Sequence, residues 1–269
     1  MEVLMKDIQL WDSVPLTMLG GHVPYMTYYP SEKPSQAAIV IFAGGGYSHR
    51  AKHEGEGYAE YFSKEGFHCF VVHYRTNPDL FPCELLDARR GVRYVRANCE
   101  QFGVDPDKIA VMGSSAGGHL AALVSTYRAA IEGEGVDAID DVDPTPNAQV
   151  LCYPVLDPEG HPGSFIRLLG EEEYKTKWPA FAPALIADEK TPICFMWHCE
   201  GDKVVNAANT LKYSMRLLEL GISQETHIYP RGRHGIGLVV NDERFVGEEY
   251  MTSWAPRAVE WFKLNGFIK

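Results

Sequence analysis

Short runs in which almost every residue is apolar recur along the chain, with amphipathic segments between them. The run Ala37–Ala43 is an example, because it lies between Pro34 and a glycine run that begins at Gly44. Strands that are apolar on both faces are typical of a sheet that helices cover on both sides. The further strands that this pattern predicts are Phe67–Tyr74, Lys108–Met112, Gln149–Tyr153, Pro192–His198 and Gln224–Tyr229.

Segments with apolar residues at helical spacing lie between these strands. In Cys83–Phe102, residues such as Leu85 and Val92 follow this spacing. Gly103 then ends the segment. The other helices predicted in this way are Glu56–Glu65, Ser115–Tyr127, Ala207–Leu220 and Trp254–Leu264. Alternating strands and helices predict an α/β protein with a mostly parallel central sheet and helices on both of its faces.

Three regions depart from this alternation. The N-terminal part is predicted to be β-rich, with short strands at Ile8–Leu10 and Tyr25–Tyr29 and a turn at Gly20 and Gly21 between them. Residues 132–146 are acidic and rich in Asp and Pro, which predicts an exposed loop.

Residues 157–190 contain several prolines and one short helical stretch near Phe165–Leu169. We interpret them as a short excursion from the sheet and not as a second domain. The whole chain, residues 1–269, is therefore predicted to form a single domain without a large cap domain, which its length allows.

The composition is that of a globular protein, and its charge narrows the choice of partners. Hydrophobic residues make up 45% and charged residues 23% of the chain, and the formal net charge is −11. An acidic surface repels nucleic-acid phosphates and anionic lipids, so we expect neither nucleic acid nor a membrane as partner. A small neutral molecule or an oligosaccharide suits this surface better. The oligomeric state stays open, with a homodimer among the options.

The cysteines and the N-terminus indicate a reducing compartment. None of the six cysteines forms a C-x-x-C pair, and several lie in apolar runs, so we expect buried reduced thiols and no metal site. The N-terminal residues carry charges and lack the apolar run of a signal peptide. We therefore expect a cytoplasmic protein.

The sequence Gly113-Ser114-Ser115-Ala116-Gly117 carries the sharpest chemical signal, because it fits G-x-S-x-G between a predicted strand and a predicted helix. A nucleophile at such a turn has strained backbone angles, and small residues two positions away let the neighbouring elements approach. Ser115 has glycine at both of these positions and Ser114 does not. Ser115 is therefore the predicted nucleophile.

A serine hydroxyl needs a base, and in this fold the order along the chain is serine, acid, histidine. His234 lies in a glycine-flanked loop after the last predicted strand and is the predicted base. Asp202 follows the strand that ends at His198, and it is the predicted acid that orients His234. Three alternative acids stay open, namely Glu200, Asp157 and Asp188.

Acyl transfer also needs donors for the oxyanion that forms on the substrate. The glycine run after Ala37–Ala43 leaves backbone N–H groups unobstructed. We predict that Gly45, Gly46 and the N–H of Ala116 form the oxyanion hole, and that Gly44 and Tyr47 contact substrate. For Tyr47, stacking on a sugar ring and structural packing are equally supported.

With these residues identified, the sequence resembles the small bacterial carbohydrate esterases of the α/β-hydrolase superfamily, including acetyl-xylan-esterase-like and feruloyl-esterase-like members. The resemblance runs from about Tyr28 to the C-terminus, over the stretches GGGYSHRAKHEGEGYA, VVHYR, DARRGVRYVRANCEQFGVDPDKIAVMGSSAGGHLAA, YPVLD, HCEGDKVVNAANT and RHGIGL. It departs from the family at Asn206, where proline is frequent. Ala43 replaces the histidine of the hormone-sensitive-lipase-like group, which argues against a bulky lipid substrate.

The resemblance implies the same triad and the same oxyanion loop. It also implies a serine esterase that removes short acyl groups, most simply acetyl, from sugars or xylo-oligosaccharides without a cofactor. An arylformamidase-like amide hydrolase, a peptidase and a non-catalytic binding protein remain alternatives. His49, His53 and Glu54 resemble metal ligands, but we expect them to line or rim the pocket. We expect His119 to be a core histidine.

Overall fold

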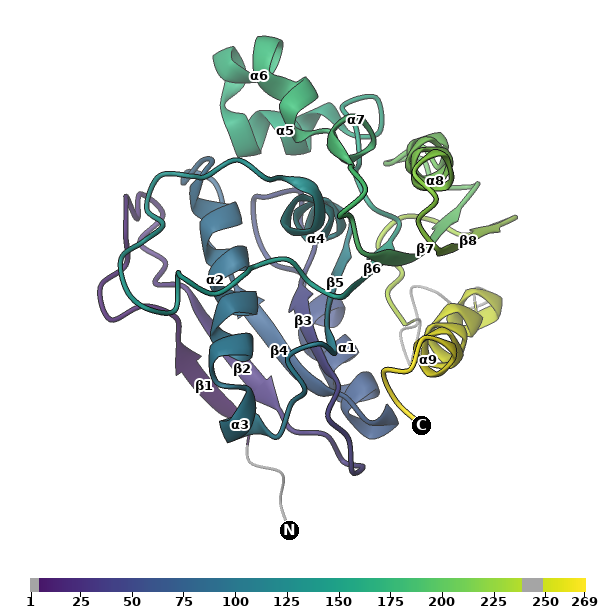
Figure 1. The fold of residues 1–269 in the computed structure, drawn as a ribbon. Coiled ribbons are helices and arrows are strands. Elements are labelled where there is room, and N and C mark those ends of the chain that lie inside the picture. The colour runs from purple at the N-terminus through teal and green to yellow at the C-terminus, as the bar shows by residue number, and fades with distance from the viewer. Residues whose placement is uncertain (1–4, 239–248) are drawn as a thin grey trace.

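The central element of the computed structural model, which describes residues 5–238 and 249–269, is one mixed sheet (Figure 1). In the described chain it has eight strands in the order β1-β2-β4-β3-β5-β6-β7-β8. β2 pairs antiparallel with β1 and with β4, and all other neighbouring strands are parallel. The strands are β1 (Lys6–Gln9), β2 (Tyr25–Tyr29), β3 (Ala38–Phe42), β4 (His68–His73), β5 (Ile109–Ser114), β6 (Ala148–Cys152), β7 (Ile193–Cys199) and β8 (Gln224–Tyr229). The predicted α/β-hydrolase architecture is confirmed.

Helices cover both faces of the sheet, as the fully apolar strands predict. Val40 and Phe42 of β3 pack on the face that α2, α4 and α8 cover, whereas Ile39 and Ile41 pack toward α1 and α9 (Figure 1). The helices of the described residues are α1 (Lys52–Glu65), α2 (Cys83–Ala97), α3 (Cys99–Phe102), α4 (Ala116–Thr126), α5 (Pro162–Leu169), α6 (Glu171–Lys177), α7 (Pro183–Ile186), α8 (Ala208–Glu219) and α9 (Trp254–Leu264), with short 3-10 turns η1 (Trp178–Phe181) and η3 (Glu249–Ser253). Along the same residues, every helix is too short or too polar to cross a lipid bilayer.

The single helix predicted over Cys83–Phe102 is wrong, because the chain breaks at Asn98 into α2 and α3. The backbone of Asn98 leaves the helical region, at φ −111° and ψ 24°. Its side-chain amide donates to the carbonyl of Tyr94 at 2.8 Å, and its backbone N–H donates to the same oxygen at 3.1 Å. This local competition with the helical hydrogen bonds is typical of asparagine.

The acidic segment 132–146 forms a largely exposed loop, as the sequence predicts, and arginines of α2 hold it by ion pairs. Arg90 forms ion pairs with Asp137 at 2.6 Å and with Asp140 at 3.1 Å, and Arg89 pairs with Glu134 at 3.0 Å. Asp140 is buried as a result. The composition of the segment predicts its lack of helix and strand, but not its partners on α2.

The excursion at 157–190 contains α5, α6, η1 and α7, where the sequence predicts one short helix near Phe165–Leu169. Its helices lie on the side of α4 that faces away from the sheet (Figure 1). The ring of Phe165 on α5 lies 4.8 Å from the ring of His119 on α4. The excursion is therefore a small helical layer packed onto the same sheet face as α4.

Candidate active site

Ser115 stands at the sharp turn between β5 and α4. Its backbone has φ 54° and ψ −120°, a strained conformation for a residue with a side chain. A Cβ added to Gly113 would lie 2.1 Å from the carbonyl oxygen of Gly117, and one added to Gly117 would lie 2.1 Å from the carbonyl oxygen of Phe42. Glycine is therefore required on both sides of Ser115, since strand and helix meet there without room for a methyl group.

The structure brings Ser115, His234 and Asp202 together in one series of hydrogen bonds. His234 Nε2 lies 2.8 Å from Ser115 Oγ, and His234 Nδ1 lies 2.7 Å from Asp202 Oδ2. A carboxylate can only accept, so Nδ1 carries the ring hydrogen and Nε2 is left to accept the serine proton. This arrangement makes Ser115 an alcohol with a base in contact.

Asp202 is buried in the turn that follows β7. Several hydrogen-bond donors surround its carboxylate. Its Oδ1 accepts the N–H groups of Val204 at 2.8 Å and Val205 at 2.9 Å. Burial on its own raises the pKa of Asp202, but hydrogen bonds from His198 and His234 outweigh it and hold the pKa well below the usual range. The carboxylate therefore stays charged opposite His234 throughout the neutral range.

His198 is a member of this site that the sequence does not indicate. Its Nε2 lies 3.2 Å from Asp202 Oδ2 and 3.0 Å from the carbonyl oxygen of Val205, and its Nδ1 lies 2.8 Å from Thr210 Oγ1. Both neighbours of Nε2 are acceptors, so Nε2 carries the hydrogen. The ring is fully buried on β7 and donates to the same carboxylate oxygen of Asp202 that His234 contacts.

The glycine run after β3 faces Ser115. Gly45 has φ 132° and Gly46 has φ 62°, which only glycine adopts without strain. Among the residues that the structure describes, the backbone N–H groups of Gly45, Gly46 and Ala116 have no hydrogen-bond acceptor. These groups are therefore available to a substrate oxygen beside the nucleophile.

Gly44, predicted to contact substrate, has a structural role. Its N–H donates to Glu54 Oε2 at 3.0 Å, and its carbonyl oxygen accepts the N–H of Ala51 at 2.8 Å. A Cβ on Gly44 would lie 2.3 Å from Glu54 Oε2 and 3.1 Å from Ser115 Cβ. Gly44 thus lets Glu54 approach the loop, and its N–H and carbonyl groups each form a hydrogen bond within the protein.

Of the two roles predicted for Tyr47, the structure favours packing over stacking on a sugar. Its ring is fully buried, and its hydroxyl lies 2.7 Å from His119 Nδ1. His119 Nε2 in turn donates to the carbonyl of Phe181 at 2.7 Å. The ring of Tyr47 therefore offers no face to a sugar and packs structurally. The expectation that His119 is a core histidine is confirmed.

Glu54, expected at the rim, is buried beneath the site. Its Oε1 accepts the hydroxyl of Tyr153 at 2.7 Å, and that hydroxyl accepts the N–H of Gly237 at 2.9 Å. The ring of Tyr153 lies 5.2 Å from the ring of His234, edge to face. One carboxylate therefore connects the glycine loop at Gly44 with the loop that carries His234.

The two neighbouring histidines stay near the surface. His53 Nε2 donates to the carbonyl of Gly235 at 2.8 Å, and His49 lies exposed with its Nδ1 3.0 Å from Ser48 Oγ. Within the described residues, no group of three or more His, Cys, Asp or Glu side chains is placed to bind a metal ion.

The excursion supplies two further residues that the sequence does not indicate. Arg167 Nη1 on α5 donates to the carbonyl oxygen of Gly46 at 2.8 Å. His161, at the start of α5, is half-buried, and burial together with the charges of Arg167 and His234 lowers its pKa. The excursion therefore reaches both the glycine loop at Gly46 and the surroundings of His234.

The family model and the relatives of this chain point to the same family. The BD-FAE family model matches residues 26–217, well over half of the chain. The chain is 30% identical over 226 residues to an acetylxylan esterase of Xylanibacter ruminicola, which is 79% of this chain and 43% of that protein. It is 30% identical over 234 residues to endo-1,4-beta-xylanase B of Butyrivibrio fibrisolvens, or 84% of this chain and 36% of that protein. The chain thus spans less than half the length of these two curated relatives.

A solved structure is similar over the full length. It is the acetyl ester-xyloside bifunctional hydrolase from Caldicellulosiruptor lactoaceticus, with a TM-score of 0.89 and 36% identity, and the match covers 98% of this chain and 97% of that one. The carboxylesterase Cest-2923 from Lactobacillus plantarum, at 20% identity and a TM-score of 0.80, shares the fold. The chain belongs to the BD-FAE family of α/β-hydrolase carbohydrate esterases.

Proposed function

We propose that this chain, as a single α/β-hydrolase domain, hydrolyses short-chain acyl esters, most simply acetyl esters, of sugars or xylo-oligosaccharides. The observation that carries the proposal is the hydrogen-bond series from Ser115 Oγ through His234 to Asp202, with links of 2.8 and 2.7 Å. Such a series activates an alcohol for attack on a carbonyl carbon.

The proposed reaction has two steps. His234 Nε2 takes the proton of Ser115 as Oγ attacks the ester carbonyl carbon. The carbonyl oxygen becomes negative and accepts hydrogen bonds from the N–H groups of Gly45, Gly46 and Ala116. His234 then gives its proton to the leaving alcohol, and an acyl-enzyme on Ser115 remains. Water, deprotonated by His234, releases the acid by the same path.

The electrostatics support this cycle. When His234 takes the proton it becomes a cation, and the buried carboxylate of Asp202 lies 2.7 Å from its Nδ1. Because the pKa of Asp202 is held low, the carboxylate is charged at each turnover and stabilises that cation. His198 fixes the carboxylate at 3.2 Å and so limits its movement.

The relatives support the proposed substrate class. A protein named acetylxylan esterase and one named acetyl ester-xyloside bifunctional hydrolase are similar to this chain over most of its length. Both names combine an acetyl ester with a xylose-based compound. This supports an acetylated sugar as substrate, although the triad itself would serve other acyl groups equally well.

The experiment compares the wild type with Ser115→Ala on three kinds of substrate. These are nitrophenyl esters of increasing acyl length, acetylated xylo-oligosaccharides, and formyl-kynurenine. We expect hydrolysis by the wild type alone, fastest for acetyl, with release of acetate from the oligosaccharides. A preference for the formamide would instead favour the arylformamidase alternative. Equal turnover by both proteins would remove Ser115 from the reaction.

A further inference from the structure

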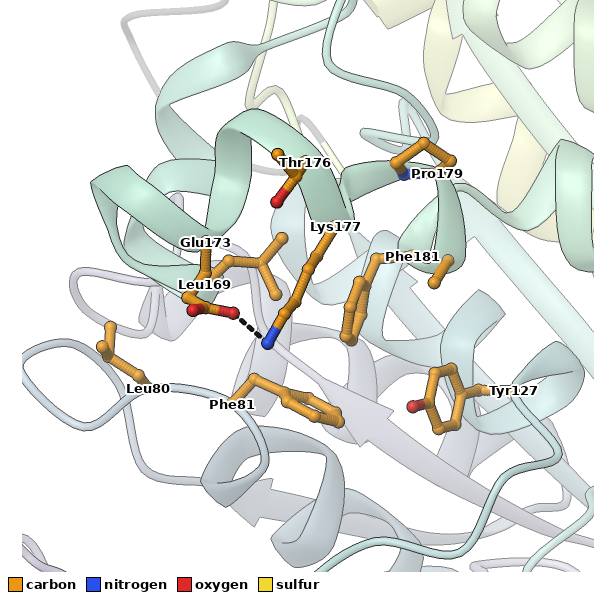
Figure 2. A pocket seen from close by; sticks show the side chains of 10 residues that line it. Leu80, Phe81, Tyr127, Leu169, Glu173, Thr176, Lys177, Pro179 and Phe181 are labelled. Carbon is orange, nitrogen blue, oxygen red and sulfur yellow. Dashed lines mark ion pairs between the residues drawn. The ribbon is translucent and has the colours of Figure 1, made fainter.

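A pocket lies between the excursion and the end of α4, away from the series Ser115–His234–Asp202. Figure 2 shows the rings of Phe81, Tyr127 and Phe181 around it, with Lys177 reaching across to Glu173. Its volume is about 650 Å³. This is within the range of about 300–1,000 Å³ that is usual for sites of small ligands.

The pocket is separate from the proposed reaction centre. Ser115 and Tyr127 flank α4 at opposite ends, which places them about 18 Å apart along the helix axis. The ring of Phe181 lines the pocket, while its carbonyl oxygen accepts a hydrogen bond from His119 at 2.7 Å. His119, in the first turn of α4, therefore packs against the pocket lining at Phe181 and against the ring of Phe165, 4.8 Å away.

The lining combines apolar faces with a neutral set of polar groups. Phe81 and Tyr127 are half-buried, so part of each ring is left open. Lys177 and Glu173 form an ion pair, so the rim offers donors and acceptors without net charge. The hydroxyl of Tyr127 makes no hydrogen bond with the residues that the structure describes, and it points toward the pocket (Figure 2).

We propose that this pocket binds a neutral sugar ring, such as a xylose unit, as a site distinct from the esterase centre. The C–H faces of a sugar pack on aromatic rings, and its hydroxyls both donate and accept hydrogen bonds. The ion pair of Lys177 and Glu173 supplies both kinds of partner at the rim, and Tyr127 supplies a third. A charged ligand would leave one member of the ion pair without compensation.

The test is a titration of the protein with unacetylated xylotriose, followed by NMR of the backbone amides. This ligand carries no ester, so binding is read without turnover and independently of the role of Ser115. We expect saturable shifts at Thr176, Lys177 and Phe181. Because a hydrogen bond to a charged group is lost, Lys177→Met should raise the dissociation constant by about tenfold.

The same helix offers a matched control. Lys175 is about as exposed as Lys177 and forms an ion pair with Glu172, but it does not line the pocket. Lys175→Met should leave the dissociation constant within about twofold of the wild type. Ala180→Trp, which fills the pocket from an exposed position, should abolish the shifts. Absent shifts at these amides, equal losses in both lysine variants, or binding of ferulate in preference to xylotriose would each overturn the proposal.

Discussion

The hydroxyl of Tyr153 donates to Glu54 Oε1 at 2.7 Å, beneath the series Ser115–His234–Asp202. The other oxygen of Glu54 accepts the N–H of Gly44 at 3.0 Å. Tyr153 also accepts the N–H of Gly237 and lies against the ring of His234. The pair therefore fixes two loops relative to each other, one with the proposed oxyanion donors and one with the proposed base, His234. We infer that Glu54 positions the reacting groups without touching the substrate.

Glu54→Gln should lower kcat by about ten- to hundredfold with little change in KM. The amide keeps the shape of the side chain, but its NH₂ group must face either Gly44 or Tyr153, so one buried donor loses its acceptor. Tyr153→Phe should have a similar effect, and the double variant should lose less than the sum, since both act through one contact.

Glu56→Gln on the same helix is the control, because Glu56 pairs only with exposed Lys52 in the described residues. Its kinetics should match those of the wild type. A Glu54→Gln protein with unchanged kcat would contradict the positioning role.

Gly117→Ala should destabilise the fold strongly. The new Cβ would lie 2.1 Å from the carbonyl oxygen of Phe42 and 2.6 Å from that of Ala43, and both are backbone atoms that cannot rotate away. We expect a loss of more than about 3 kcal/mol in the free energy of unfolding, measured by urea denaturation.

Gly57→Ala provides the opposite case. Gly57 lies inside α1, and nothing stands within 4 Å of its added Cβ. The substitution should stabilise the protein by about 0.5–1 kcal/mol. Equal effects of the two substitutions would show that the close packing around Ser115 is not what requires glycine.

His119 should make stability sensitive to acid. Burial lowers the pKa of His119 to about 4, although its hydrogen bond to Phe181 acts in the opposite direction. Below about pH 6.5 the unfolded chain binds a proton at this position and the folded chain does not. The contribution is fully present above that pH and is lost progressively as the pH falls toward 4. From pH 7 to pH 5 it amounts to about 2 kcal/mol.

Urea denaturation of the wild type and His119→Gln at both pH values measures this contribution. The glutamine variant should show a fall between pH 7 and pH 5 that is smaller by about 2 kcal/mol. His49→Gln, at an exposed position, should behave like the wild type. The same fall in all three proteins would exclude His119 as the source.

Sequence reasoning located the three residues of the series because each depends on local rules. Ser115 lies in a motif with a strand before it and a helix after it, and Asp202 and His234 follow the ends of β7 and β8. In a parallel sheet these ends meet at one edge, so the order along the chain is enough to bring the three together.

The supporting residues could not be predicted in this way, because their roles depend on the packing of whole elements. Helix α1 begins at Lys52, four residues before its predicted start, and this places Glu54 in its first turn. Arg167 and His161 lie in the excursion, whose path over α4 has no strong pattern in the sequence. Burial of Tyr47 likewise depends on its contact with His119, 72 positions away.

The central claim is that Ser115 becomes acylated and that His234 drives this step. Rapid mixing with nitrophenyl acetate, quenching in acid and peptide mass spectrometry measure it directly. We expect a burst of nitrophenol equal to the enzyme concentration and an acetyl group on the peptide that contains Ser115. His234→Ala should remove the burst while the protein stays folded. A full burst in Ser115→Ala, or an acetyl group on another residue at equal rate, would contradict the account.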